Sequence, residues 1–391
     1  MNDLTKALKT GFIDKFGETD GIRIFFAPGR VNLIGEHTDY NGGHVFPCAL
    51  TIGTYAAVRV RKDRLCRFYS ENFPDIGVIS CSLDDEFTYN QADNWVNYVK
   101  GVIWSFREHG YAAGNGFDFY CKGTIPNGSG LSSSASLEIL VSKVLIELFG
   151  FDVNMIDASI YSQYAENRYV GVNCGIMDQF AIAMGRANSA IFLDTASLNY
   201  EYVPLKLDGI RLVIGNTNKK RGLGDSKYNE RRAECEHALE ELQSVCNIAT
   251  LGGLDEESFE RVADAITEPV ERRRAKHAVY ENQRTVKAVE ALNNNDIALF
   301  GELMNQSHIS LRDDYEVTGT ELDTLVAAAW KQPGVIGARM TGAGFGGCTV
   351  AMVREDCVES FIEHVGAEYK EKIGYSADFY VVDIGDGPRE L

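Results

Sequence analysis

The chain has 391 residues, of which 45% are hydrophobic and 24% are charged, and its formal net charge at pH 7 is −18. The composition is that of a folded globular protein, and the length predicts two domains rather than one. Nucleic acids and anionic membranes need a basic protein face, so the strongly negative charge excludes both as partners. An anionic small molecule is still compatible with the sequence, because backbone N–H groups, a few cationic side chains and a metal ion can form a local pocket.

The N-terminal residues and the cysteines predict a cytoplasmic protein. Leu4, Leu8, Phe12 and Phe16 recur every four residues, which is typical of a short amphipathic helix and not of a secretory signal. No stretch is long and apolar enough to cross a membrane. The nine cysteines are odd in number, scattered and without a CxxC pair. They predict free thiols in a reducing compartment and give no support for a zinc site.

The first half of the chain predicts strands followed by helices. Alternating residues with aromatic or β-branched side chains predict strands at 22–27, 55–61, 67–70 and 117–121. A strong helix follows the loop at 126–132, because Leu137, Leu140, Val144 and Leu148 fall on one helix face. A helix over about 156–169 and a strand at 190–194 come next. The polar stretch 198–208 is the expected junction between a domain at 1–205 and a domain at 206–391.

The second half continues with elements of both kinds. We expect strands at 210–215, 348–353 and 379–384, and helices at 225–245, 275–292, 296–305, 320–330 and 358–369. This mixed order predicts an α+β fold rather than a doubly wound parallel sheet.

The segment GTIPNGSGLSSSAS at 123–136 lies between a predicted strand and the strongest helix. Glycines let the backbone bring its N–H groups close to a ligand, and the first helical turn carries unpaired amides at the positive end of the dipole. A single serine would be enough to cap the helix. Three serines after Gly-Ser-Gly exceed that need and favour a phosphate-binding loop. The loop is not a Walker A motif, because no lysine follows the glycines.

Two further segments combine glycines with polar residues. The segment APGRVNLIGEHTDYNGG at 27–43 places Arg, Glu, His, Asp and Asn between glycines, a mixture of donors and acceptors that suits a polyol as well as a solvated loop. The segment RMTGAGFGGC at 339–348 formally contains GxGxxG. A dinucleotide-binding fold needs a helix after those glycines, whereas a strand is predicted here, so a tight turn around a ligand or another loop fits better.

The three segments together resemble the galactokinase branch of the GHMP small-molecule kinases. GRVNLIGEHTDYNGG at 29–43 is similar to the galactokinase signature, IPNGSGLSSSAS at 125–136 to the family's phosphate loop, and RMTGAGFGGCTV at 339–350 to its third motif. All three occur in the family's order, so the resemblance covers essentially the whole chain. It implies an N-terminal half like domain 2 of ribosomal protein S5, a ferredoxin-like C-terminal half, and an active site between them.

The resemblance also implies roles for particular residues. The implied sugar contacts are Arg30, Glu36, His37, Asp39, Gly175, Asp178 and Tyr228. The implied nucleotide contacts are Gly128, Ser129, Gly130, Leu131, Ser132, Ser133, Ser134 and Ala135, with Trp95 and Tyr98 near the adenine. Trp95 and Tyr98 would be explained equally well as core aromatics. Asp178 matches the catalytic base, Arg30 would hold Asp178 and meet the developing phosphoryl charge, and Ser134 and Glu166 match the pair that binds Mg²⁺.

The implied reaction transfers the γ-phosphoryl group of ATP to the C1 hydroxyl of D-galactose, the first committed step of galactose use. ATP is then a substrate, Mg²⁺ is required, and we expect a monomer. One alternative is an N-acetylgalactosamine kinase, although such relatives usually depart from TDYNGG at 38–43. Another is a silent sugar sensor that contacts a transcriptional regulator. Such sensors lose the Ser-Ala step of the phosphate loop, which Ser134 and Ala135 retain here.

Overall fold

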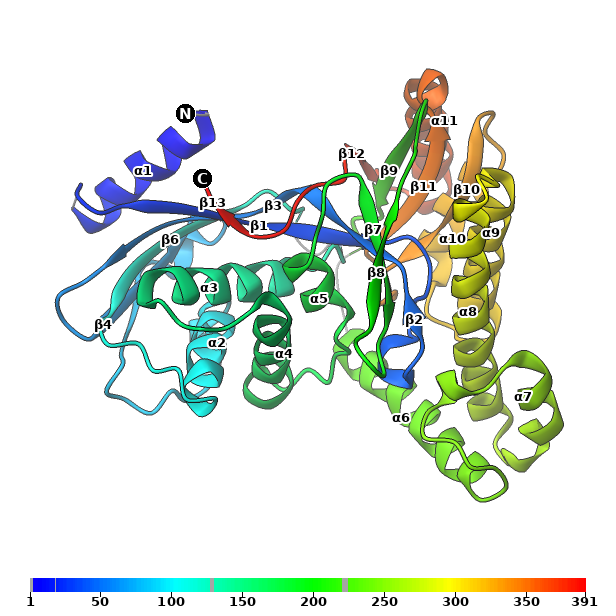
Figure 1. The fold of residues 1–391 in the computed structure, drawn as a ribbon. Helices are drawn as coiled ribbons and strands as arrows, with labels where there is room; N and C mark the ends of the chain where they lie inside the picture. Colours follow the sequence, from blue (N-terminus) through cyan, green and yellow to red (C-terminus); the bar gives the residue numbers. More distant parts are fainter. Residues whose placement is uncertain (1–2, 18, 127–129, 220–223) are drawn as a thin grey trace.

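The computed structural model describes residues 3–17, 19–126, 130–219 and 224–391. The molecule is elongated, with the N-terminal half at one end, the C-terminal half at the other, and the last residues running back across the N-terminal half (Figure 1). Three β-sheets with helices packed against them make a mixed α and β architecture, as predicted.

A six-stranded sheet forms the frame of the N-terminal half. Its order is β13 (Arg389–Glu390), β1 (Arg23–Asn32), β3 (Pro47–Val60), β6 (Phe117–Gly123), β4 (Leu65–Ser70) and β5 (Ile79–Ser82). Neighbouring strands are antiparallel except β4 and β6, which are parallel. The pairing of β1 with β3 shifts register between Pro28 and Arg30, so a bulge lies beside Arg30. Such bulges re-aim side chains, and this one lies next to the candidate site.

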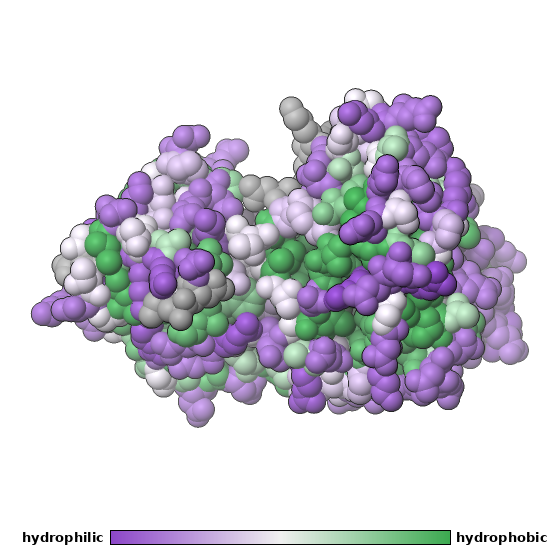
Figure 2. Space-filling model, turned by 90° about the horizontal axis from the view of Figure 1, so that it is seen from above, coloured by the Kyte–Doolittle hydropathy of each residue, from purple (hydrophilic) through white to green (hydrophobic). Residues whose placement is uncertain are grey.

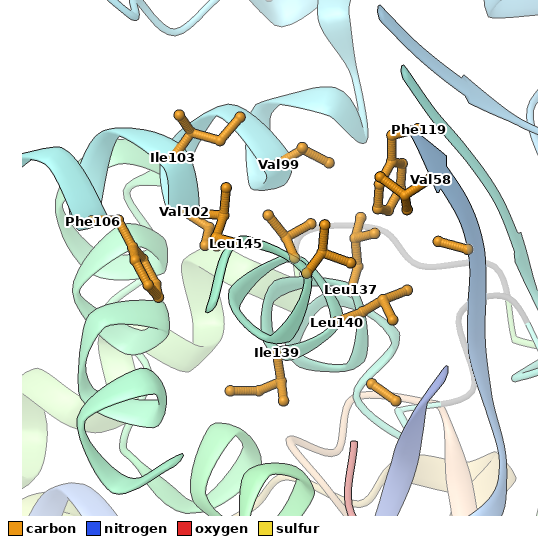
Figure 3. Close-up of a cluster of buried hydrophobic side chains, with 14 of the residues drawn as sticks. Val58, Val99, Val102, Ile103, Phe106, Phe119, Leu137, Ile139, Leu140 and Leu145 are labelled. Carbon is orange, nitrogen blue, oxygen red and sulfur yellow. The ribbon is translucent and has the colours of Figure 1, made fainter. Parts of the chain in front are cut away.

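Both faces of this sheet are covered, which follows from the alternation of side chains along its strands. Helix α1 (Asp3–Phe16) covers one face through Leu8, Phe12 and Phe16, which pack on Ile24 and Ala57. Helices α2 (Val96–Glu108), α3 (Ser133–Phe149) and α4 (Met155–Ala165) lie under the other face (Figure 1). Figure 3 shows α3 at the centre of this second core, between α2 and the strands that carry Val58 and Phe119.

The C-terminal half is built on an antiparallel four-stranded sheet. Its order is β10 (Val335–Thr341), β11 (Cys348–Arg354), β9 (Ile210–Asn216) and β12 (Asp378–Val382). Its helices are α6 (Gly224–Gln243), α7 (Glu256–Val262), α8 (Pro269–Asn293), α9 (Ile297–Asp313), α10 (Gly319–Ala329) and α11 (Val358–Ile373). Val213 packs with α10 and α11, whereas its neighbours Leu212 and Ile214 pack with α8 and α9.

The two halves share one hydrophobic core. Val31, Leu33 and Phe46 from the N-terminal half pack in the same cluster as Ile214 and Phe300 from the C-terminal half. A small sheet of β2 (His44–Val45), β7 (Ser189–Asp194) and β8 (Tyr200–Pro204) lies beside this junction. The first motif, residues 29–43, therefore runs between the two halves.

The predicted elements are present, with four corrections. Strand β1 extends to Asn32, so the first motif begins on a strand and not in a loop. Arg339 and Thr341 belong to β10, so the third motif also begins on a strand. The polar stretch 198–208 contains β8, and the helix predicted at 156–169 changes at Glu166 into a π-helical segment, Glu166–Val170. The domain boundary after residue 205 stays a prediction.

Hydrophilic residues cover both ends of the face shown in Figure 2, and many of its hydrophobic residues lie in the middle. Of the helices in the described ranges, none is long and apolar enough to span a bilayer.

Candidate active site

A cavity of about 260 Å³ lies where the three motifs meet. Its wall contains nearly all residues predicted for the site that the structure describes, together with the glycine turn between β10 and β11. The lining residues from the predicted set are Arg30, Glu36, His37, Asp39, Tyr98, Gly130, Ser132, Ser133, Ser134, Glu166, Gly175, Asp178 and Tyr228. Residues more than 300 positions apart in the chain, such as Arg30 and Phe345, thus face one space.

An ion pair between β1 and helix α5 (Met177–Ala183) lies on one wall of the cavity. Arg30 Nε and Nη2 each donate to a different oxygen of Asp178 at 2.8 Å, a bidentate arrangement. Arg30 Nη1 donates to the Gly130 carbonyl, also at 2.8 Å, and the Ser132 hydroxyl donates to Asp178 Oδ2. Arg30 is 4% exposed, whereas the Asp178 carboxylate remains 29% exposed. Asp178 is therefore held firmly and still faces the cavity.

The first turn of α3 is held in a special backbone conformation. Ser132, the residue before the helix, has a φ of 60°, which is unusual for a residue other than glycine. Such strain is typical of functional sites, where surrounding contacts maintain it. Ser133 and Ser134 face the cavity, whereas the side chains of Leu131 and Ala135 are fully buried behind it. Gly128 and Ser129, also predicted to bind the nucleotide, lie outside the described residues.

The third motif packs directly on this loop. A Cβ atom added to Gly342, which has a φ of 86°, would lie 2.8 Å from the Gly130 carbonyl oxygen. A Cβ atom on Gly344 would lie 2.3 Å from the Val317 carbonyl oxygen. Strand β11 follows these glycines, so the turn is not a dinucleotide-binding fingerprint. The predicted alternative, a turn shaped around another loop, is confirmed.

Glu36 connects the first motif with the third. Its carboxylate accepts hydrogen bonds from Asn32 Nδ2 at 2.6 Å and from the Gly342 amide at 2.8 Å, and Arg339 Nη2 lies 2.7 Å from Oε2. Thr341 Oγ1 lies 3.0 Å from Oε1. Burial raises the pKa of Glu36, and the Arg339 guanidinium opposes that effect. Glu36 is only 1% exposed, so it is an internal link of the site as well as part of its wall.

His37 presents one unpaired nitrogen of a neutral ring. Its Nδ1 bonds the Tyr40 hydroxyl at 2.7 Å, and Tyr40 in turn bonds the Tyr315 hydroxyl at 2.7 Å. Burial lowers the pKa of His37 to about 3, with His277 adding to the effect. Nε2 has no hydrogen-bond partner among the described residues, and the ring lines the cavity beside Tyr228. A buried polar atom without a partner is suited to a polar ligand.

Asp39 lies against the chain entering α5. Its Oδ2 accepts the Met177 amide at 3.4 Å, and burial together with Asp178 raises its pKa to about 6. Gly175 is required beside it, because an added Cβ atom would lie 1.9 Å from Asp39 Oδ2. The glycine therefore lets Asp39 approach the backbone at the edge of the cavity.

Ser134 offers a hydroxyl oxygen and Glu166 offers carboxylate oxygens, which are ligands of the kind that Mg²⁺ prefers. Both line the cavity, and they come from the first turn of α3 and the start of the π-helical segment. Burial and then Asp178 raise the pKa of Glu166 to about 7, so a cation nearby would favour its charged form. No cluster of three or more His, Cys, Asp or Glu side chains in the described ranges could hold a metal. One hydroxyl and one carboxylate fit an ion that keeps its waters and binds phosphate oxygens.

The two aromatic residues predicted near the adenine differ in position. Tyr98 lines the cavity. Trp95 is 6% exposed within the core between α2 and the sheet, which matches its alternative interpretation as a core aromatic. Contact of either residue with adenine stays a prediction.

Several residues that build the site were not predicted. Arg339 opens the third motif, so its sequence position was a signal, but its ion pair with Glu36 was not foreseeable. Gln179 follows Asp178 directly and bonds the buried Glu138 and Glu166. Tyr315 lies outside every motif, and no pattern in the sequence distinguishes it.

Three family models match the chain in the order of these motifs. They are the galactokinase galactose-binding signature at residues 10–60, the GHMP kinases N terminal domain at 97–186 and the GHMP kinases C terminal domain at 288–371. Together with the fold they define the class, a two-domain GHMP kinase. Mevalonate kinase from Methanococcus jannaschii shares this fold, with a TM-score of 0.67 at 16% identity over 94% of this chain and all of the other.

Proteins with higher sequence identity to this chain show which family within this class it belongs to. Galactokinase from Clostridium beijerinckii is 61% identical over 98% of both chains, and galactokinase from Bacillus subtilis is 55% identical over 99% of both. The crystal structure of Lactococcus lactis galactokinase complexed with galactose has a TM-score of 0.97 at 51% identity, covering 99% of this chain and all of the other. The chain belongs to the galactokinase family of ATP-dependent sugar kinases.

The clash at Gly175 predicts that Gly175→Ala damages the site. The added methyl group forces Asp39 or the start of α5 to move, and a displacement of about 1 Å in an active site can reduce the rate about 100-fold. We expect a loss of this size in sugar-dependent ADP release. Gly253→Ala is the matched control, because among the described residues no atom beyond its chain neighbours and the backbone of its own helical turn lies within 4 Å of its added Cβ. Equal activity of the two variants would contradict the role of Gly175.

The raised pKa of Asp39 predicts a pH-dependent gain in stability for Asp39→Asn. An acid with a pKa near 3.8 when unfolded and about 6 when folded stabilises the folded state below pH 3.8, and this contribution is lost as the pH rises past 6. The variant cannot titrate, so its free energy of unfolding relative to wild type should increase between pH 4 and pH 7.5, by at most about 3 kcal/mol. Chemical denaturation measures this difference. Asp208→Asn, at an exposed position, should show no such change with pH, and an identical pH profile for both variants would refute the assignment.

Proposed function

We propose that this protein transfers the γ-phosphoryl group of ATP to the C1 hydroxyl of D-galactose, giving galactose 1-phosphate and ADP. The observation that carries the proposal is the Asp178 carboxylate, held by Arg30 and Ser132 between the first turn of α3 and the first motif. A proton acceptor in this position supports a reaction between a nucleotide on one side and a polyol on the other. We expect the protein to act as a cytoplasmic monomer.

The nucleotide side is the first turn of α3. The amides of a first helical turn and its positive dipole end suit phosphate oxygens, and Ser133 and Ser134 offer hydroxyls on the same side. Arg30 lies next to this turn through its bond to the Gly130 carbonyl. Its guanidinium can meet the charge that develops on the transferred group. Phosphoryl transfer depends mainly on such positioning and charge stabilisation.

The sugar side is the pocket formed by the first motif and the residues around α5. His37 Nε2, the Asp39 carboxylate and the Tyr228 ring come from three separate segments and face one cavity. Glu36 lines the same cavity and is already engaged by Asn32, Arg339 and Gly342, so it fixes the position of the first motif beside the sugar. A site with such fixed polar groups rejects sugars that leave them unpaired, at a cost of about 1–3 kcal/mol for each group.

The hydrogen bonds of Asp178 indicate which oxygen receives the proton. Oδ2 accepts from both Arg30 Nη2 and Ser132, so both of its lone pairs are used. Oδ1 accepts only Arg30 Nε among the described residues, which leaves one lone pair for the C1 hydroxyl. Because Arg30 fixes the carboxylate plane, Oδ1 is oriented before the sugar binds. Asp178 then acts as the general base.

Ser134 and Glu166 would hold Mg²⁺. When bound, the ion neutralises phosphate oxygens and orients the triphosphate. The α3 turn supplies the hydroxyl and the π-helical segment supplies the carboxylate.

The substrate is tested by measuring ADP release with purified protein, Mg²⁺ and a panel of galactose, glucose, talose and N-acetylgalactosamine. Phosphorus NMR then locates the phosphorylated carbon. We expect galactose to be the best substrate and C1 the position. Preference for N-acetylgalactosamine would assign the chain to the other kinase, and binding of galactose and ATP without turnover would support the sensor.

The base is tested with Asp178→Asn. Asparagine keeps the shape of the side chain but cannot accept the proton, so kcat should fall about 100-fold or more, the usual contribution of a positioned base. Galactose affinity, measured by calorimetry, should change much less. Retention of most of the wild-type kcat would exclude Asp178 as the base.

A further inference from the structure

Behind the candidate magnesium site lies a second buried carboxylate, Glu138. It is on α3, four residues after Ser134, so the two side chains leave the helix on the same face. Glu138 is 0% exposed, and it reaches Glu166 through a third residue. Gln179 Nε2 donates to Glu138 Oε2 at 3.0 Å and to Glu166 Oε2 at 2.7 Å. One amide thus bridges two carboxylates.

This arrangement has more acceptors than donors. Glu138 Oε1 and Gln179 Oε1 are both buried and without a hydrogen-bond partner among the described residues. No Arg, Lys or His side chain of the described part forms an ion pair with Glu138 or Glu166, and burial together with Glu166 raises the pKa of Glu138. Two acceptor-only groups in a buried site need a proton or a cation to be stable together. A hydrated cation supplies both positive charge and hydrogen-bond donors.

We propose that Glu138 and Gln179 form the outer layer of the magnesium site and that Glu138 is a positioning residue for Glu166. The amide of Gln179 fixes the orientation of the Glu166 carboxylate, and the negative charge of Glu138 increases the attraction of the site for a divalent cation. This inference rests on the proposed function, since it concerns the metal site of the same reaction. Outer-layer partners of this kind usually contribute about 10- to 100-fold to metal affinity.

The test is the affinity of the protein for Mn²⁺ in the presence of ADP, measured from the free-Mn²⁺ signal by electron paramagnetic resonance. Glu138→Gln removes the charge and keeps the shape, and we expect it to weaken Mn²⁺ binding about 10-fold or more. Glu147→Gln is the matched control, because Glu147 lies on the same helix at its exposed end, paired with Lys143. The control should bind Mn²⁺ like wild type. Equal Mn²⁺ affinity of Glu138→Gln and wild type would overturn the proposal.

A second measurement separates this role from a purely structural one. Without metal, Glu138 is protonated beside Glu166, so Glu138→Gln replaces one neutral group with another of the same shape, and its thermal midpoint should stay close to that of wild type. A lower midpoint with unchanged Mn²⁺ affinity would mean that Glu138 serves the core alone. If Glu138→Gln does not fold, Gln179→Met tests the same bridge, and we expect it to weaken Mn²⁺ binding as well.

The same preparations separate this inference from the proposed function. Wild-type protein that shows no sugar-dependent ADP release and no Mn²⁺ binding with ADP would refute both. Wild-type protein that shows both, together with unaltered Mn²⁺ affinity in the Glu138→Gln and Gln179→Met variants, would refute only the role of Glu138.

Discussion

The bidentate pair of Arg30 and Asp178 is the interaction on which the site depends. It joins the end of β1 to the start of α5, and the remaining Arg30 nitrogen and Ser132 extend it to the first turn of α3. Arg30 is almost fully buried, so loss of either partner would leave an uncompensated charge, which usually costs about 3–5 kcal/mol. The bulge at Pro28 and Arg30 is the local distortion of β1 that accompanies this pair. The orientation of Asp178, the proposed base, and the shape of the loop before α3 are therefore determined together.

The side chains around this pair include more buried acids than bases, and this excess favours the binding of a cation. Asp39, Glu138 and Glu166 are acids with pKa values raised by burial, and all three lie near Asp178. Folding alone does not favour such a group of carboxylates, and strongly shifted acids are typical of functional sites. On the other wall, burial keeps His37 neutral with one nitrogen unpaired. A cation near Glu166 would balance the negative charge of these carboxylates. A polyol near His37 would supply a hydrogen-bond partner for its unpaired nitrogen.

Much of the fold follows from local patterns, whereas the site depends on long-range contacts. The apolar face of α3 and the alternation in β6 were predicted because each depends on neighbouring residues, and residues 224–243 form the predicted helix. The first and third motifs were expected to be loops, yet both begin on strands, since their glycines mark close approach to other segments and not only turns. Arg30, Asp39 and Asp178 were found through a family resemblance. The contacts that Arg339 and Tyr315 make could not be predicted from the sequence, because their partners lie about 300 residues away in the chain.

The third motif explains why the two halves act as one site. Gly342 allows β10 to approach the Gly130 carbonyl, and Arg339 on the same strand reaches Glu36 in the first motif. Arg339 also donates to Ser307 on α9, which donates to Glu281 on α8, and Glu281 accepts the Gly35 amide. Helices of the C-terminal half thereby hold the loop that carries Glu36 and His37. Because Glu36 and Gly130 both lie against Gly342, a displacement of the first motif would also displace the loop before α3. In the proposed reaction, the position of the sugar hydroxyl relative to the phosphate is therefore a property of the packing between the halves, and not of either half alone.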